Sequence, residues 1–161
     1  YIGLFQGARR PLVMSRDWHH AHLSYLRAMG GPWPPHCVQG TEGAGFHSDL
    51  ALPGDAVIVS KGMGAAEDAY SAFQARDDDG RSLGQILEGM AIRHLYVGGL
   101  ALDYCVKASA LDARRQGLAV TVLIDATRAV NVNIHDAELA IEELVRATVA
   151  LATIELLQEE R

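Results

Sequence analysis

The segment His94-Leu-Tyr-Val-Gly-Gly-Leu-Ala-Leu-Asp-Tyr-Cys-Val106 joins a short apolar run to a helical pattern through two glycines. Its first residues, His94–Gly98, predict a buried strand, and the residues Val106–Gln116 predict a helix. Gly117 is the expected C-terminal cap of that helix, because glycine adopts the left-handed backbone conformation without strain. A strand that leads directly into a helix is typical of α/β proteins with a parallel sheet.

The same alternation of strand and helix extends through the rest of the chain. Further strands are predicted at Pro11–Ser15, Ala56–Ser60, Ala119–Ile124 and Val149–Ala152, and further helices at Ser82–Glu88 and His135–Arg146. Residues Tyr1–Phe5 have the apolar content of the last turns of a helix. The pattern predicts an α/β fold with a parallel sheet covered on both faces, in which ligand sites lie beyond the carboxyl ends of the strands.

Length and composition predict a single domain over residues 1–161. The chain is 49% hydrophobic and 21% charged, without an internal repeat or linker. Its net charge of −6, with no basic run, argues against nucleic acid and anionic lipid as partners and favours a small-molecule substrate. No apolar stretch is long enough to cross a bilayer, and Tyr1 is not followed by a signal-peptide pattern, so we expect a cytoplasmic protein.

A group of histidines follows the first predicted strand and predicts a metal site. Asp17 and His19 form an Asp-x-His pair, and His36 is held by two prolines a short way on. Three protein ligands leave open positions for water or substrate, as in catalytic metal sites. His20 and His22 are ambiguous; we favour His22 as the auxiliary group, a further ligand or a partner of one. Zinc, iron and manganese all accept nitrogen and oxygen ligands of this kind, so the ligand set alone does not identify the metal.

Cys105 is a candidate nucleophile because it stands at the start of a predicted helix. Unpaired N–H groups and the helix dipole at such a position stabilise a thiolate and can bind an oxyanion. Lys61 closes the strand Ala56–Ser60, which places a cation at the same carboxyl edge of the sheet. The alternatives are a small buried cysteine and a solvated lysine at a strand end.

Five motifs in this order resemble the nicotinamidase/pyrazinamidase branch of the isochorismatase-like hydrolases, and the resemblance covers the whole chain. The motifs are Asp17-Trp-His19, Trp33-Pro-Pro-His-Cys-Val-Gln-Gly-Thr41, Lys61-Gly, Tyr70-Ser-x-Phe73 and Gly99-Leu-Ala-Leu-Asp-Tyr-Cys-Val106. The resemblance implies a Rossmann-like three-layer α/β/α fold with a six-stranded parallel sheet. It also implies hydrolysis of nicotinamide to nicotinate and ammonia in NAD salvage, with pyrazinamide as a further candidate substrate.

The resemblance assigns a role to each site residue. Cys105 forms a thioester with the substrate and Lys61 assists, while the N–H groups of Ala101 and Cys105 form the oxyanion hole after a cis Leu100–Ala101 peptide. One divalent metal ion, zinc before iron or manganese, is held by Asp17, His19 and His36 and orients the pyridine ring. The pocket walls are Trp33, Tyr70, Leu100 and Tyr104. The sequence does not determine whether the protein forms a homo-oligomer.

The family's proton carrier is an aspartate in an Asp-x-Gln-x-Asp-Phe stretch on the central strand, and residues 1–161 contain no such stretch. Asp103 is two residues from Cys105 but matches a different family position, so we do not assign it as the base. We expect on the order of 30 to 40 further residues before Tyr1, about one strand-loop-helix unit.

Three alternatives differ from nicotinamide hydrolysis. The first is a related hydrolase acting on another small amide or carbamoyl compound. The second is a non-catalytic homologue that binds a metal or ligand. The third is a cytosolic redox protein that uses Cys37 and Cys105, which the absence of a Cys-x-x-Cys spacing disfavours.

Overall fold

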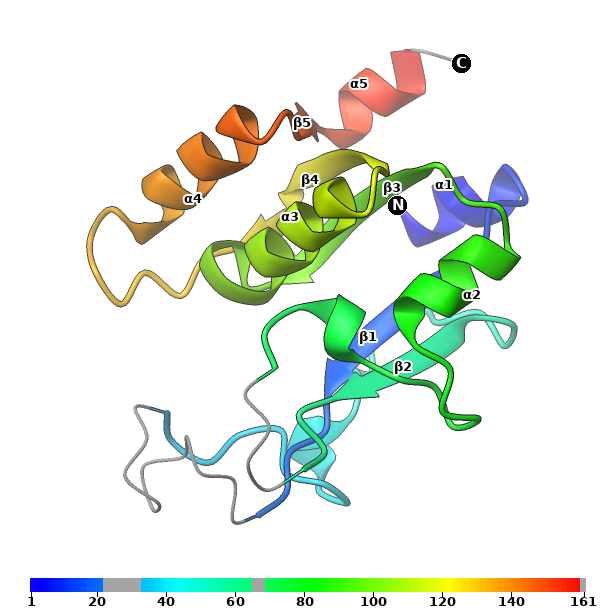
Figure 1. The fold of residues 1–161 in the computed structure, drawn as a ribbon, viewed down its shortest axis with the longest axis vertical. Helices are drawn as coiled ribbons and strands as arrows, with labels where there is room; N and C mark the ends of the chain where they lie inside the picture. The colour runs from blue at the N-terminus through cyan, green and yellow to red at the C-terminus, as the bar shows by residue number, and fades with distance from the viewer. Residues whose placement is uncertain (22–32, 65–68, 160–161) are drawn as a thin grey trace. The chain divides into compact units, whose positions relative to one another are not determined.

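A computed structural model describes residues 1–21, 33–64 and 69–159 of the chain. The chain divides into two compact units, Tyr1–Gln85 and Ile86–Arg161. Figure 1 shows the elements of both units.

The first unit is built on a two-stranded parallel sheet of β1 (Val13–Asp17) and β2 (Val57–Lys61). Helix α1 (Ile2–Gly7) precedes β1, and the short 3-10 helices η2 (Glu42–Ala44) and η3 (Ala72–Gln74) flank β2 in the sequence. In Figure 1 the two strands lie side by side. Their register pairs Asp17 with Lys61, so the sheet itself places these two charged residues next to each other at its carboxyl end.

The second unit contains a three-stranded parallel sheet in the order β3-β4-β5. The elements of this unit are β3 (His94–Leu100), the π-helix η4 (Leu102–Val106), α3 (Lys107–Arg115), β4 (Ala119–Arg128), α4 (Asp136–Arg146), β5 (Ala150–Ala152) and α5 (Ile154–Glu159). Helices α3 and α4 pack on each other and on the sheet. Ala110 and Ala113 of α3, Leu144 of α4 and Val122 of β4 are fully buried.

The predicted elements are found close to their expected limits. Helix α2 (Leu83–Gly89) runs across the boundary of the two units, and Ser82 and Gln85 form the reciprocal hydrogen bonds of a capping box at its start. Gly117 ends α3 with a φ of 82°, as its cap position requires. Helix α5 was not predicted.

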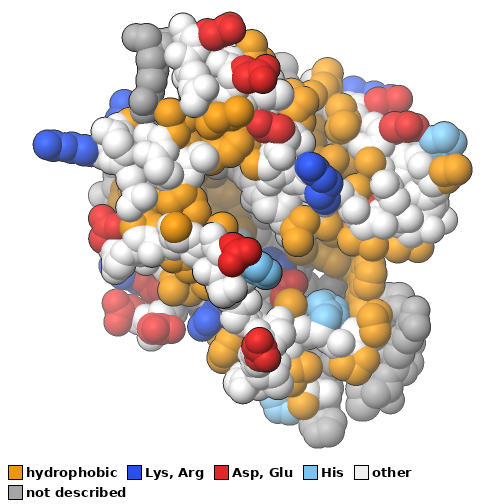
Figure 2. Space-filling model, turned by 180° about the vertical axis from the view of Figure 1, so that it is seen from behind, with side chains coloured by type: hydrophobic (Ala, Val, Ile, Leu, Met, Phe, Trp, Pro, Cys, Tyr) orange, Lys and Arg blue, Asp and Glu red, His pale blue; other side chains and the backbone are white. Residues whose placement is uncertain are grey.

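The parallel α/β class is confirmed, but the described residues form two sheets of two and three strands and not one sheet of six. Within these residues β1 pairs only with β2, and β3 pairs only with β4. The six-stranded three-layer arrangement and the single domain stay predictions. None of the described helices is both long enough and apolar enough to span a bilayer. On the face in Figure 2, acidic and basic side chains are interspersed among apolar ones.

Candidate functional site

The first unit brings Asp17, His19 and His36 together at the carboxyl end of β1. Asp17 is the last residue of the strand and His19 follows two residues later. The loop that carries His36 is fixed beside His19 by two backbone hydrogen bonds of 2.9 Å, from His19 N to Cys37 O and from Gln39 N to His19 O. These bonds form a short parallel bridge, which sets the loop in register with the segment after β1.

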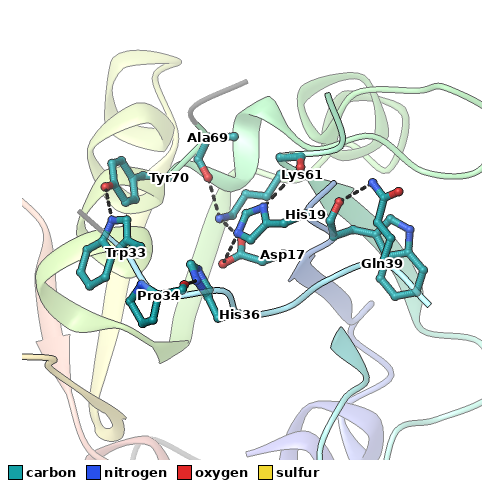
Figure 3. Close-up of polar contacts among 11 residues, drawn as sticks. Asp17, His19, Trp33, Pro34, His36, Gln39, Lys61, Ala69 and Tyr70 are labelled. Carbon is teal, nitrogen blue, oxygen red and sulfur yellow. Dashed lines mark hydrogen bonds and ion pairs between the residues drawn. The ribbon is translucent and has the colours of Figure 1, made fainter. Parts of the chain in front are cut away.

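The rings of both histidines present the Nε2 atom to the cluster. His19 Nδ1 is 3.3 Å from the carbonyl oxygen of Gly62, and His36 Nδ1 is 2.8 Å from that of Pro34. Because a carbonyl oxygen only accepts, each Nδ1 is the donor in this contact, which leaves Nε2 as the ring nitrogen that faces the other two residues and could bind a metal. One ligand atom from each of Asp17, His19 and His36 lies within 4.8 Å of the other two (Figure 3). Metal-binding histidines are oriented in this way, so the three residues fit a divalent metal ion.

Lys61 is part of this cluster. Its side chain is buried, and Nζ donates to Asp17 Oδ1 and, at 2.8 Å, to the carbonyl oxygen of Ala69. The other carboxylate oxygen, Oδ2, is 3.6 Å from His19 Nε2. Burial by itself raises the pKa of Asp17, but the His19 imidazole beside Oδ2 and the Lys61 ammonium group bound to Oδ1 hold that pKa below its usual value. The carboxylate is therefore ionised at neutral pH, with one oxygen bound by Lys61 and the other directed to the metal position.

Two aromatic residues predicted to line a substrate pocket also lie at this cluster. Trp33 Nε1 donates a hydrogen bond of 2.9 Å to the hydroxyl of Tyr70, and the Trp33 ring meets His36 edge-on with centroids 6.3 Å apart. Tyr70 follows Ala69, whose carbonyl oxygen binds Lys61 (Figure 3). The hydrogen bond joins the two aromatic side chains, and Trp33 lies beside His36, one of the three candidate metal ligands.

The predicted nucleophile lies in the second unit, in the turn that links β3 to α3. The Leu100–Ala101 peptide is cis, as expected. The helical segment begins at Leu102 and not at Val106, because the first turn is a π-helix that contains Cys105. The carbonyl oxygen of Ala101 accepts the N–H groups of Tyr104 and Val106, at 3.1 and 3.0 Å. Single π-helical turns inside helices occur frequently at functional sites.

Asp103 anchors this turn, a role that sequence reasoning missed. Its buried carboxylate accepts hydrogen bonds from the backbone N–H groups of Val130, at 2.9 Å, and Asn131, at 2.8 Å. These bonds fasten the start of the Cys105 turn to the loop after β4. An acidic residue in an otherwise apolar turn was the available signal, since a buried carboxylate requires donors.

The remaining predicted residues are placed as follows. Among the described residues the cluster of candidate ligands contains Asp17, His19 and His36 but not His20, which is exposed. His22 lies outside the described residues. Leu100 is 75% exposed at the end of β3, and Tyr104 is half-buried in η4. Their roles in a substrate pocket stay predictions.

The sequence matches one protein family over most of its length. The model of the isochorismatase domain covers residues 5–155. Nicotinamidase/pyrazinamidase from Mycobacterium tuberculosis is 38% identical over 143 residues, which are 87% of this chain and 75% of that protein. Nicotinamidase from Acinetobacter baylyi is 37% identical over 139 residues, which are 76% of this chain and 65% of that protein.

Solved structures with the same fold support the same family. Pyrazinamidase of Pyrococcus horikoshii, in complex with zinc, has a TM-score of 0.86 at 39% identity, covering 96% of this chain and 81% of that one. A protein of L. infantum in complex with nicotinate has a TM-score of 0.80 at 34% identity, covering 94% and 78%. The chain therefore belongs to the isochorismatase family, in its nicotinamidase/pyrazinamidase branch, and by class is an amidohydrolase. The chain spans 65% of the length of the Acinetobacter baylyi protein.

Proposed function

We propose that this protein hydrolyses nicotinamide to nicotinate and ammonia, and pyrazinamide by the same chemistry. The observation that carries the proposal is the cluster of Asp17, His19 and His36 with the hydrogen-bonded Trp33 and Tyr70 beside it. The cluster suits a metal that anchors a heteroaromatic ring, and the aromatic pair suits the flat face of that ring. Relatives named nicotinamidase and a related structure that holds nicotinate support this substrate.

The metal in this proposal is zinc, held by Asp17 Oδ2 and by Nε2 of His19 and His36. Imidazole and carboxylate donors suit zinc, and the zinc-bound pyrazinamidase of Pyrococcus horikoshii supports the choice over iron and manganese, which accept the same donors. When bound, the ion would supply an electrophilic anchor for the pyridine nitrogen or for a water molecule next to it. Lys61 supports the ion indirectly, because it fixes Asp17 with one oxygen turned to the histidines.

In the proposed reaction the Cys105 thiolate attacks the amide carbon, the carbon–nitrogen bond breaks, and ammonia leaves with an added proton. Water then attacks the thioester, which releases nicotinate and restores the thiol. The N–H groups of Ala101 and Cys105 would bind the oxyanion, and Lys61 would assist with its charge. We do not propose Asp103 as the proton carrier, because two backbone N–H groups already hold its carboxylate.

The proposal extends to the domain, the compartment and the assembly state of the protein. Residues 1–161 form a single catalytic domain, since the family match runs across both units. The protein acts in the cytoplasm in NAD salvage. It works on a small molecule, either as a monomer or as a homo-oligomer.

The test is ammonia release from nicotinamide by the purified protein, with and without Zn²⁺. Cys105→Ala is expected to abolish turnover while Zn²⁺ affinity stays unchanged. Cys37→Ala, the same change at the other cysteine, is the matched control and is expected to keep turnover. If the two cysteines instead formed a redox pair, either variant would lose reversible oxidation. Ammonia release from another amide or carbamoyl compound but not from nicotinamide would favour the related hydrolase. Zn²⁺ binding without ammonia release from any of these would favour the non-catalytic homologue.

A further inference from the structure

The side chain of Gln39 connects two segments that end at the proposed metal site. Its Nε2 atom donates to the carbonyl oxygen of Trp18 at 2.7 Å and to that of Met63 at 3.2 Å. Trp18 directly follows β1, and Met63 stands two residues after the end of β2. Figure 3 shows Gln39 in the neighbourhood of His19. One amide group therefore holds the ends of both strands.

Each segment that Gln39 contacts carries or orients a candidate metal ligand. Trp18 lies between Asp17 and His19 in the sequence, and Met63 follows Gly62, whose carbonyl oxygen orients the His19 ring. The backbone N–H of Gln39 donates to His19 O at 2.9 Å. Gln39 itself is three residues after His36, so its contacts also place the loop that carries the third ligand.

The primary amide suits these contacts for a chemical reason. Two backbone carbonyl oxygens converge on one atom, and the NH2 group has two hydrogens to donate. An aliphatic side chain of the same length would fill the space but leave both carbonyl oxygens without this donor. The loop also contains Cys37 in the left-handed conformation, with a φ of 46°, which the surrounding contacts must maintain.

We propose that Gln39 is a positioning residue of the metal site, which pre-orders Asp17, His19 and His36 before the ion binds. This proposal rests on the metal site in the proposed function. Residues that orient metal ligands through hydrogen bonds usually change metal affinity by about 10- to 100-fold when they are replaced. Sequence reasoning did not single out Gln39, because its partners depend on how β1 and β2 pair.

The test uses the full protein with Gln39→Met, which keeps the side-chain length and removes the donor. Gln116→Met makes the same change at the exposed end of α3 and serves as the matched control. The Zn²⁺ dissociation constant is measured by competition with a chromogenic chelator, and the visible spectrum of bound Co²⁺ reports ligand geometry. Melting of the metal-free protein is recorded in parallel. If Gln39→Met does not fold, Gln39→Asn replaces it, because its amide is one methylene too short to reach both carbonyl oxygens.

We expect the Zn²⁺ dissociation constant to rise about 10- to 100-fold in Gln39→Met, with an altered Co²⁺ spectrum, and to change less than about threefold in Gln116→Met. A Gln39→Met protein that melts earlier without metal but binds Zn²⁺ like the parent overturns the proposal, because it assigns Gln39 to folding alone. Tight Zn²⁺ binding by the parent in that case leaves the proposed metal site intact. A parent that binds no Zn²⁺ overturns the metal site and, with it, the role of Gln39.

Discussion

The buried ion pair between Lys61 and Asp17 predicts a large loss of stability in Lys61→Met. The ammonium group lies at the end of a buried side chain and binds Asp17 and the carbonyl oxygen of Ala69. Methionine fills much of the same space but leaves the Asp17 carboxylate beside His19 without its cation. The substitution therefore tests the charge with little change in packing.

The size of the loss follows from burial. Removing one partner of a buried ion pair costs about 3–5 kcal/mol, because the other charge stays buried and unpaired. The side chain of Asp17 is 22% exposed, so water replaces part of the lost interaction, and we expect about 3 kcal/mol, at the lower end of that range. In a protein of this size, that loss lowers the melting temperature by roughly 6–12 °C.

The assay is urea unfolding of the metal-free protein in the presence of a chelator. Lys107→Met is the matched control, because Lys107 forms an ion pair with Glu143 at 3.0 Å in which the two side chains are 29% and 51% exposed. Such a surface pair contributes about 1 kcal/mol or less. Adding Asp17→Asn to Lys61→Met should recover part of the stability, since the unpaired charge is then gone. A loss in Lys61→Met no greater than in Lys107→Met would refute the reasoning.

Three further outcomes follow from the structure. The pKa of Asp17 is lower in the folded than in the unfolded protein, so its contribution to stability is complete above about pH 4 and is lost as the pH falls through the folded pKa. Urea unfolding of the metal-free protein between pH 6 and about pH 3 should therefore depend less on pH in Asp17→Asn than in the parent. Asp103→Ala removes the acceptor of two backbone N–H groups. It should lower the free energy of unfolding by about 2 kcal/mol and reduce kcat, with Zn²⁺ affinity unchanged. An unchanged kcat in the folded variant would contradict the role of Asp103 in holding the Cys105 turn. Chelation should abolish ammonia release from nicotinamide, and Zn²⁺ should restore it; full activity after chelation would remove the metal from the mechanism.

Local sequence signals were sufficient for the parallel α/β class and for most elements. Apolar runs and caps act over a few neighbouring residues, so Ser82 at the start of α2 and Gly117 at the end of α3 could be predicted from the sequence. Helix α5 was missed because its start depends on a distant partner, the Asp125 carboxylate, which accepts the N–H of Ile154 at 3.0 Å. The π-helical turn at Cys105 is too short to produce a repeating pattern of apolar residues, so the sequence did not predict it.

For the candidate site, the sequence determined which chemical groups are present, and tertiary structure decided what each one binds. The motifs selected Asp17, His19 and His36 as ligands and Lys61 as a cation near the thiol. Strand register set Lys61 against Asp17, 44 residues away in the sequence, and the position of Lys61 near the thiol stays a prediction. The carbonyl oxygens that fix the histidine rings, and the contacts of Gln39 and Asp103, likewise depend on the meeting of distant segments. Hydrogen bonds of this kind are set by the path of the backbone, which residue types and their spacing do not specify.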